Sequence, residues 1–375
     1  MTKKLPHYRF QGYTDAWELR KLGEVVYRSN LTSSSKDLPR LEFEDINSGL
    51  GTLNKDISQK VDDRKGLEFN EGDVLFGKLR PYLKNWWYAE FKGIALGDFW
   101  NLKSDLWHSC FLYTYIQSNS FQLVANDTSG TKMPRSDWNL VAESIAKFPS
   151  LPEQEAIGTF FSTLDQQITL HQRKLDTLKE QKKTYLKLLF PAKGQTKPAL
   201  RFQGFEDDWK EVKLGELCDI RTGKLDANAM VENGEYDFYT SGIKKYRIDV
   251  AEFEGPAITI AGNGATVGYM HLADGKFNAY QRTYVLTNFK VDRRYIFSEI
   301  AKKLPIKIQQ EARTGNIPYI VLSMLTELSI SLPSLPEQKA IGTFFQTLDQ
   351  EIAQVEDKLA SLKEMKKTLL RKLFV

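Results

Sequence analysis

The sequence predicts an α+β protein in which two mixed, strand-rich domains are joined by two long helices packed as an antiparallel coiled coil, with a pseudo-twofold internal repeat. Three observations predict it. A 40-residue segment occurs twice at a constant offset of 184 positions, a shorter motif opens each half of the chain, and the stretches between them carry short apolar runs. The length of 375 residues also exceeds that of one ordinary domain.

The repeat fixes the expected domain order. Residues 151–190 and 335–374 align without a gap and are identical at 26 of 40 positions. Arg9-Phe-Gln-Gly12 returns as Arg201-Phe-Gln-Gly204, which indicates duplication of a whole unit rather than a solenoid repeat of roughly 20–50 residues. The predicted parts are a first domain (1–150), a first helix (151–190), a linker (191–200), a second domain (201–334) and a second helix (335–375).

Both copies of the repeated segment begin with a helix start signal. Ser150 suits the N-cap, Pro152 lies in the first turn and Glu153 completes the pattern of a capping box. Ser334 and Glu337 repeat this pattern. Acidic residues early and lysines late suit the helix dipole. Each copy is therefore predicted to form one helix of about 36 residues, roughly 54 Å long at 1.5 Å per residue.

Apolar residues recur at three- and four-residue spacing along both predicted helices, as in a packed helical seam interrupted at His171, Lys182 and Lys366. Because a lone helix would expose this stripe to water, we expect the two helices to pack on each other. The alternative is that each packs only on its own domain. The predicted seam consists of Ile157, Phe161, Leu164, Ile168, Leu175 and Leu178 in the first helix and Ile341, Phe345, Leu348, Ile352, Leu359 and Leu362 in the second.

Both intervening domains are predicted to be rich in strands, with boundaries uncertain by several residues. In the first, residues 73–76, 86–88 and 94–100 are expected to be strands and 110–123 a short helix. In the second, the expected elements are strands at 257–260 and 284–287 and a helix around 295–304.

The composition excludes several classes of protein. With 41% hydrophobic and 27% charged residues the chain can bury cores, and no apolar run approaches the roughly 18 residues of a membrane span. Cys110 and Cys218 lack the spacing of a zinc site or a disulfide scaffold, so a reduced, cytosolic protein is expected. The net charge of +4 is compatible with nucleic acid without demonstrating it.

No enzyme motif is complete. Residues 72–79 nearly form a P-loop, but Leu79 stands where serine or threonine must hold magnesium. The glycines of 262–268 miss the dinucleotide fingerprint, and the histidines are scattered. Asn316-Ile-Pro-Tyr319 lacks the first proline of the Asn-Pro-Pro-Tyr loop of adenine methyltransferases, and the nuclease-like Glu90-Phe-Lys92 has no convincing partner acid upstream. The sequence therefore favours a binding protein.

The repeated helix opening L-P-E-Q-x-A-I-G-x-F-F-x-x-L-D-x-x-I, at 151–168 and 335–352, resembles the specificity subunit of type I restriction–modification systems. The K-L-G-E motifs and the segments 72–81 and 262–268 carry the same resemblance, which covers essentially the whole chain. It implies two target-recognition domains, each reading half of a bipartite DNA sequence, with the two helices as the spacer between them. Dissimilar domains imply an asymmetric target.

The resemblance also implies the partners: double-stranded DNA, two methyltransferase (M) subunits and restriction (R) subunits, in the cytoplasm and with no membrane. It places S-adenosylmethionine, ATP and magnesium on those subunits, so that this chain would carry no catalytic residue, metal or cofactor. Two rival hypotheses remain. One is a coiled-coil protein-interaction scaffold without sequence-specific DNA contact, and the other is a self-contained methyltransferase or nuclease.

Candidate DNA-binding residues are chosen for their chemistry and their expected place in loops. Lysine and arginine bind phosphates, and Arg, Asn, Gln or Lys can read base edges. An ordinary solvated loop is the alternative for each cluster. The candidates are Lys78, Arg80, Lys84, Lys132 and Arg135 in the first domain and Lys244, Lys245, Arg247, Asn263, Arg282, Arg313 and Asn316 in the second.

Overall fold

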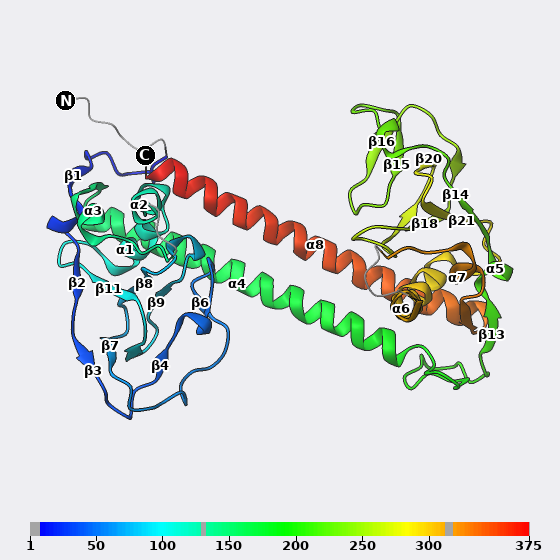
Figure 1. The fold of residues 1–375 in the computed structure, drawn as a ribbon, viewed down its shortest axis with the longest axis horizontal. Coiled ribbons are helices and arrows are strands. Elements are labelled where there is room, and N and C mark those ends of the chain that lie inside the picture. The colour runs from blue at the N-terminus through cyan, green and yellow to red at the C-terminus, as the bar shows by residue number, and fades with distance from the viewer. Residues whose placement is uncertain (1–7, 129–132, 312–317, 375) are drawn as a thin grey trace. The chain divides into compact units, whose positions relative to one another are not determined.

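The computed structural model describes residues 8–128, 133–311 and 318–374, which form two compact units (Figure 1). Unit 1 comprises residues 1–173 and 356–375, and unit 2 comprises residues 174–355. Each unit is rich in strands and includes part of both long helices. The predicted α+β class with two strand-rich units and two long helices is confirmed.

Unit 1 contains two four-stranded sheets, ordered β2-β11-β8-β9 and β3-β7-β10-β4, together with the pairs β1·β12 and β5·β6. The strands are β1 (Glu18–Lys21), β2 (Tyr27–Ser29), β3 (Thr32–Ser33), β4 (Arg40–Leu41), β5 (Ile46–Asn47), β6 (Thr52–Leu53), β7 (Gly66–Phe69), β8 (Val74–Gly77), β9 (Trp86–Tyr88), β10 (Gly93–Ala95), β11 (Phe99–Lys103) and β12 (Ile145–Phe148). The helices are α1 (Ser109–Ile116), α2 (Asn119–Ala125), α3 (Trp138–Glu143) and α4 (Leu151–Leu188), with 3-10 turns η1 (Leu22–Glu24), η2 (Phe43–Asp45) and η3 (Pro81–Leu83).

Unit 2 repeats this plan with sheets ordered β14-β21-β18-β19 and β16-β15-β20-β17 and the pair β13·β22. Its strands are β13 (Lys210–Lys213), β14 (Asp219–Thr222), β15 (Tyr236–Tyr239), β16 (Tyr246–Ile248), β17 (Phe253–Glu254), β18 (Ala257–Ala261), β19 (Met270–Ala273), β20 (Lys276–Ala279), β21 (Thr283–Thr287) and β22 (Ser329–Leu332). Its helices are α5 (Leu214–Leu217), α6 (Arg293–Glu311), α7 (Leu322–Thr326) and α8 (Leu335–Leu373), with the 3-10 turn η4 (Ala227–Ala229).

The two units share the topology of their first sheet although their sequences share little, whereas the strand order of the second sheet differs. Each has one four-stranded antiparallel sheet whose buried strand, β8 or β18, lies between two neighbours. Each second sheet contains one parallel pair, β10 with β4 and β15 with β20. A strand covered on both faces needs mostly apolar side chains, which explains the buried runs of β8 and β18, where Thr259 is the one polar side chain.

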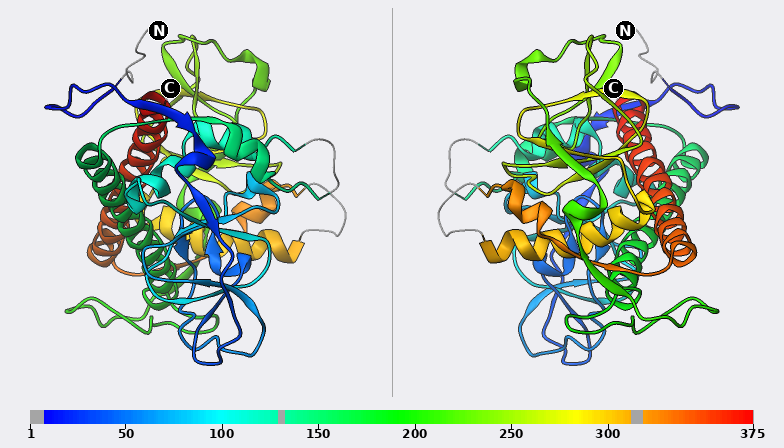
Figure 2. Two further views of the ribbon diagram at one scale, coloured as in Figure 1. Left: turned by 90° about the vertical axis from the view of Figure 1, so that its left-hand side faces the viewer. Right: turned by 90° about the vertical axis from the view of Figure 1, so that its right-hand side faces the viewer.

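In each unit the segments of α4 and α8 run antiparallel (Figures 1 and 2). In unit 1, Lys366 Nζ lies 2.6 Å from Asp165, and Lys363 Nζ lies 3.2 Å from the side chain of Gln172. A later residue of α4 therefore meets an earlier residue of α8, as antiparallel helices require. In unit 2, the ring of Tyr185 packs 5.0 Å from that of Phe344. All twelve predicted seam residues are buried.

The end of each long helix also completes the core of a unit. Phe374, beyond the end of α8, packs its ring 6.2 Å from Trp17 and 5.7 Å from Phe111 in unit 1. Phe190, beyond the end of α4, packs 6.2 Å from Trp209 and 5.5 Å from Tyr295 in unit 2. The helices therefore pack both on each other and on the domains, which joins the two alternatives drawn from the sequence.

The repeated Leu-Pro-Glu-Gln opening fastens each helix to its unit through its acid. Both carboxylate oxygens of Glu153 accept hydrogen bonds from the Arg9 guanidinium at 2.8 and 2.7 Å, and those of Glu337 accept from Arg201 at 2.7 and 2.8 Å. The predicted capping box is therefore wrong for Glu153, because its carboxylate binds a distant arginine instead of the serine N–H. These hydrogen bonds raise the pKa of Arg9 and of Arg201.

The glutamine and glycine of the same motif hold a second helix against the first. Gln154 Oε1 accepts from the backbone N–H of His108, and Gln338 Oε1 accepts from that of Asp292, at the starts of α1 and α6. A Cβ on Gly158 would lie 2.7 Å from the Cβ of Cys110, and one on Gly342 would meet backbone at 2.8 Å. Glycine is thus required for this close approach.

Two elements differ from their predicted form. The single strand expected at 94–100 is two strands, β10 and β11, because Gly97 turns the chain with φ 99°. The helix expected at 110–123 is divided into α1 and α2, because the Ser118 side chain accepts from the N–H of Phe121 and caps a new helix.

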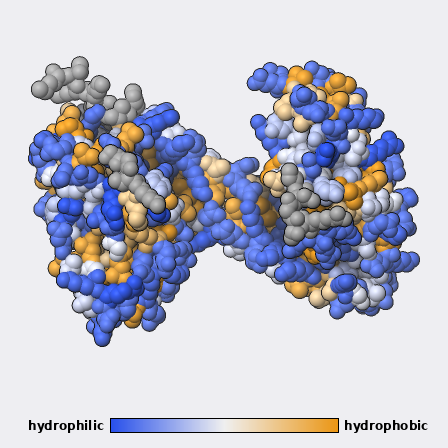
Figure 3. All heavy atoms as spheres, in the orientation of Figure 1, coloured by the Kyte–Doolittle hydropathy of each residue, from blue (hydrophilic) through white to orange (hydrophobic). Residues whose placement is uncertain are grey.

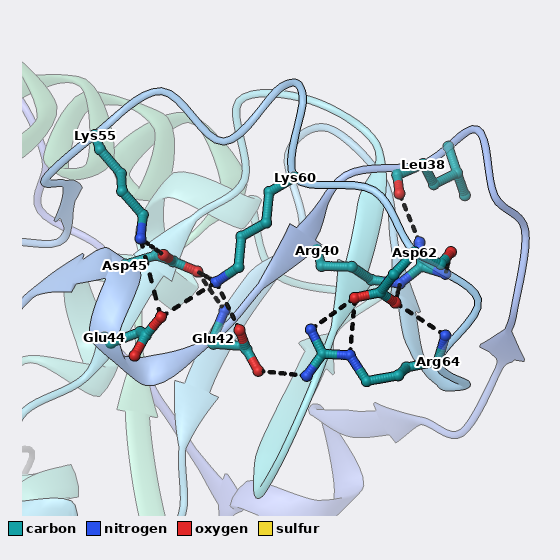
Figure 4. Close-up of polar contacts among 9 residues, drawn as sticks. All are labelled: Leu38, Arg40, Glu42, Glu44, Asp45, Lys55, Lys60, Asp62 and Arg64. Carbon is teal, nitrogen blue, oxygen red and sulfur yellow. Dashed lines mark hydrogen bonds and ion pairs between the residues drawn. The ribbon is translucent and has the colours of Figure 1, made fainter.

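An ion-pair network braces the second sheet of unit 1 (Figure 4). Asp45 is fully buried, and its carboxylate lies 2.7 Å from Lys60 and 2.9 Å from Lys55. Glu42 joins Lys60 at 2.6 Å and Arg64 at 2.8 Å. Because a buried carboxylate is stable only when it is paired, these cations are committed to the fold.

Candidate nucleic-acid interface

The loop after the buried strand β8 brings three of the unit 1 candidates together. Leu79 forms an isolated bridge with Arg135, and the backbone N–H of Arg80 donates to the carbonyl of Pro134. The side chains of Lys78 and Arg135 converge on Asp98, at 3.5 and 3.0 Å. These two cations are therefore already paired with a carboxylate.

Arg80 and Lys84 flank the turn η3 and are more available. Both have left-handed backbone conformations, with φ 50° and 58°, which direct the turn sharply out of the sheet. Both side chains are exposed, and neither forms an ion pair with a residue in the described ranges. Between them, Tyr82 exposes 57% of its surface. A cation–aromatic–cation turn of this kind can bind phosphate and stack on an unpaired base.

Unit 2 has the equivalent bridge, formed by Asn263 and Tyr319 after β18. Asn263 Oδ1 accepts a 2.6 Å hydrogen bond from the Ser241 hydroxyl, and the Ser241 carbonyl in turn accepts from Thr266. Asn263 is thus held with its amide NH2 free of any other partner in the described part of the chain. An oriented amide can form a two-bond contact with adenine.

The basic cluster 244–247 divides into free and committed side chains. The Lys244 ammonium lies 5.5 Å from the ring of Tyr246 and has no ion-pair partner within the described ranges. Arg247 lies 2.5 Å from Asp237 and donates to the carbonyls of Gly234 and Glu235, so its guanidinium joins β15 to β16 and the loop before β15. The Arg247 side chain therefore holds the fold of unit 2 together, which is the alternative to DNA contact for this residue.

Lys245 is intermediate between these cases. Its ammonium lies 5.6 Å from the ring of Tyr239 and 3.5 Å from Asp237. Burial acts to lower the pKa of Lys245, but the neighbouring Tyr239 and Asp237 outweigh it and raise the pKa. The ammonium therefore stays charged at neutral pH.

The remaining candidates are Arg282, Lys132, Arg313 and Asn316. Arg282 is exposed, and its backbone carbonyl accepts from the N–H of Gly262 at the end of β18. Its side chain has no ion-pair partner among the residues that the structure covers. Lys132, Arg313 and Asn316 lie outside the described residues.

Sequence reasoning missed a set of cations at the end of α8. Lys363, Lys366, Lys367 and Arg371 lie on one helix face and line a groove in unit 1 that Lys84 also borders. Lys363, Lys367 and Arg371 are four residues apart and Lys366 follows Lys363 by three, a spacing that indicates one basic helix face. Nothing in the sequence links them to Lys84.

Features that suggested other chemistry have structural roles. The near-match to a P-loop contains the fully buried strand β8. Burial raises the pKa of the Cys218 thiol to about 12, so it remains protonated. Within residues 8–128, 133–311 and 318–374, no three or more His, Cys, Asp or Glu side chains form a group that could hold a metal ion. No helix there is long and apolar enough to cross a membrane.

Comparison with known proteins follows the two halves of the chain. A family model described as the type I restriction modification DNA specificity domain matches residues 14–180 and again 206–364. The specificity subunit of the type I restriction enzyme EcoDI from Escherichia coli is 38% identical over 164 residues, which is 44% of this chain and 36% of that protein. That of MjaVIII from Methanocaldococcus jannaschii is 22% identical over 342 residues, 80% of this chain and 75% of that protein. The match thus spans about a third of the E. coli relative and three quarters of the archaeal one.

Two solved structures are similar in fold. The S subunit of a type I restriction–modification system from M. genitalium has a TM-score of 0.72 and 17% identity, with 99% of each chain covered. A chain from a study of complex assembly and conformational transition of the type I R-M system has a TM-score of 0.51 and 19% identity, covering 96% of this chain and 98% of that one. At these identities the likeness concerns the fold.

Proposed function

The chain belongs to the type I restriction–modification DNA specificity family, and from this premise we propose that it reads a bipartite, asymmetric DNA target, one half with each unit. Its role is recognition rather than catalysis. It docks two methyltransferase subunits, and restriction subunits join that assembly in the cytoplasm. S-adenosylmethionine, ATP and magnesium belong to those partners.

The observation that carries the proposal is that equivalent loops of the two units hold different side chains. At the equivalent bridge after the buried strand, unit 1 presents Leu79 and Arg135, whereas unit 2 presents Asn263 and Tyr319. The exposed Arg80 lies beside the unit 1 bridge. An arginine suits guanine and an asparagine suits adenine, so equivalent loops would read different bases. Unlike half-sites follow from this difference.

The test uses the full chain with its methyltransferase subunits and selects bound duplexes from a random library. One variant carries Arg80→Gln alone, and the other combines Asn263→Ala with Arg282→Gln, so that each variant loses one positive charge. Each should weaken base preference in one half-site only, with each lost base contact reducing discrimination by about 1–3 kcal/mol. The exposed Lys36→Gln and Lys197→Gln serve as charge-matched controls in units 1 and 2.

Two outcomes would contradict the proposal. Loss of preference in both half-sites from a change in one unit would exclude modular reading. A wild-type assembly that enriches no bipartite motif would favour the scaffold hypothesis, in which the helices only join partner proteins.

A further inference from the structure

A basic groove of about 880 Å³ lies within unit 1 and borders the turn at which the proposed function places Arg80 for base reading. We define it by Lys84, from the turn after β8, and by four side chains of α8. Among the described residues, Asp165 is the one carboxylate that lines it. Five cations against one acid give a strongly positive surface on a chain whose net charge is only +4. The α8 members are Lys363, Lys366, Lys367 and Arg371.

Most of these cations are available to a ligand. Lys84 and Arg371 are exposed and have no ion-pair partner among the residues described. Lys367 lies 3.6 Å from Glu364, a mostly exposed pair that contributes little. Lys363 donates one exposed hydrogen bond of 3.2 Å to the Gln172 side chain. Lys366 is committed, because Asp165 and the side chain of Gln117 both lie 2.6 Å from its ammonium. Lys366 therefore shapes the wall, and the other cations can bind.

The available α8 cations form a row. Lys363, Lys367 and Arg371 are four residues apart, so they recur about every 6 Å along one helix face. Helix α2 contributes Asn119 to the lining, together with Gln122 and Asn126, whose NH2 groups already donate to the carbonyls of Ile116 and Gln122. Such amides, with lysine and arginine, are the usual donors to the sugar–phosphate backbone. A row of point charges and neutral donors suits a regularly spaced polyanion.

Duplex DNA fits this groove better than an acidic peptide does. Lys84 is both a groove residue and one end of the turn that starts at Arg80, so a strand contacting Arg80 passes directly to the groove. A peptide helix would bind through an apolar stripe, whereas the α8 wall presents ammonium and guanidinium groups.

We propose that the basic groove holds the sugar–phosphate backbone of the DNA beside the half-site that unit 1 reads. It supplies affinity without sequence information, so that the end of α8 contributes phosphate contacts in addition to packing. This inference rests on the proposed function and deepens it.

The test measures binding of the full chain, alone and with methyltransferase subunits, to a target duplex and a scrambled duplex of equal length from 50 to 300 mM salt. Lys367→Gln with Arg371→Gln should weaken both complexes equally, by on the order of 30-fold at 0.15 M salt if two phosphate contacts are lost. The slope of log K against log salt should fall by roughly 2, because each contact contributes about 0.9. Base preference in library selection should not change.

The control is Lys36→Gln with Lys65→Gln, which removes two charges from loops beside β3 and β7 while leaving the groove intact. Its slope should stay close to that of the wild type, and thermal unfolding should show all variants folded. An unchanged slope for the groove variant would overturn the inference while leaving the proposed function standing. So would a variant that binds DNA normally but loses methyltransferase subunits, since the groove would then hold protein. A wild type that prefers no sequence would instead refute the proposed function.

Discussion

Lys366 of α8 forms an ion pair with Asp165 of α4 at 2.6 Å, and the same pair recurs 184 positions away as Lys182 with Asp349 at 2.5 Å. These lysines are the positions at which the apolar seam is interrupted. The interruption is therefore a polar contact between the antiparallel helices, formed once in each unit. Since one lysine can reach its aspartate at only one register, the pair helps to fix the alignment of the helices.

We expect Lys366→Ala to lower the stability of unit 1 by about 1–2 kcal/mol at pH 7. The Lys366 and Asp165 side chains are only 13% and 20% exposed. Burial raises the pKa of Asp165 while Lys366 opposes that rise, so removing the lysine leaves a poorly solvated carboxylate. Lys182→Ala is the internal control and should cost less than about 1 kcal/mol, because its pair is 27% and 38% exposed.

Denaturant unfolding of both variants at pH 7 and pH 4 checks this prediction. Because the pKa of Asp165 is raised in the folded protein, its ionisation lowers the free energy of unfolding as the pH rises through that pKa. Removing Lys366 lowers the free energy of unfolding further only while the Asp165 carboxylate is charged. The cost of Lys366→Ala should therefore shrink in acid. An equal cost at both pH values would contradict the electrostatic explanation.

Glu42→Gln should cost about 1 kcal/mol at pH 7 and almost nothing near pH 2. Hydrogen bonds from Lys60 and Arg64 lower the pKa of Glu42. A lowered folded pKa contributes stability above the unfolded pKa, and this contribution is lost as the pH falls through the lowered value. Unfolding curves between pH 7 and pH 2 measure it. Glu44→Gln, whose side chain is 71% exposed, is the control and should have little effect at either pH.

Gly158→Ala and Gly342→Ala should each destabilise the protein by about 1–3 kcal/mol. Alanine normally favours a helix by up to about 1 kcal/mol. Here its Cβ would lie 2.9 Å or less from backbone atoms of a neighbouring helix, so the clash outweighs the propensity. Thr159→Ala, at the next and exposed position, should be neutral or slightly stabilising in calorimetry. A stabilised Gly158→Ala variant would show that α1 can move away without cost.

Leu369→Tyr should stabilise unit 1 by about 1 kcal/mol by filling a pocket. This pocket of about 160 Å³ lies between Tyr8, Phe160 and Leu369. At the equivalent position of unit 2, Tyr185 packs its ring 5.0 Å from Phe344. The reciprocal Tyr185→Leu should therefore destabilise unit 2. Thermal unfolding would contradict the prediction if the two exchanges shifted stability in the same direction.

The long helices could be predicted because their signal is local and occurs twice. Caps and breaks that depend on tertiary contacts could not. Glu153 has a capping-box pattern in the sequence, but Arg9, 144 residues away, binds its carboxylate. Likewise, the turn at Gly97 and the new cap at Ser118 divide elements that apolar spacing alone shows as continuous.

The sequence could predict which residue types would form the candidate interface, but not which of their side chains are free of ion pairs within the protein. Lys78 and Arg247 have the right chemistry, yet Asp98 and Asp237 engage them, and these acids are brought near by the fold. Lys84 and Arg371 meet at one groove although 287 positions separate them. No spacing rule reaches that far, because only the antiparallel return of α8 brings the two residues together.

The closure of unit 1 by Phe374 has a consequence for synthesis on the ribosome. Unit 2 is one continuous stretch, residues 174–355, whereas unit 1 lacks part of its core until residues 356–374 have emerged. Domains usually fold in the order in which they are made. Here the half that is translated first must wait, with Trp17 and Phe111 uncovered by Phe374, until the second half is complete. A nascent chain from which residue 355 has emerged but residues 356–374 have not would thus hold one unit with a complete core and one without.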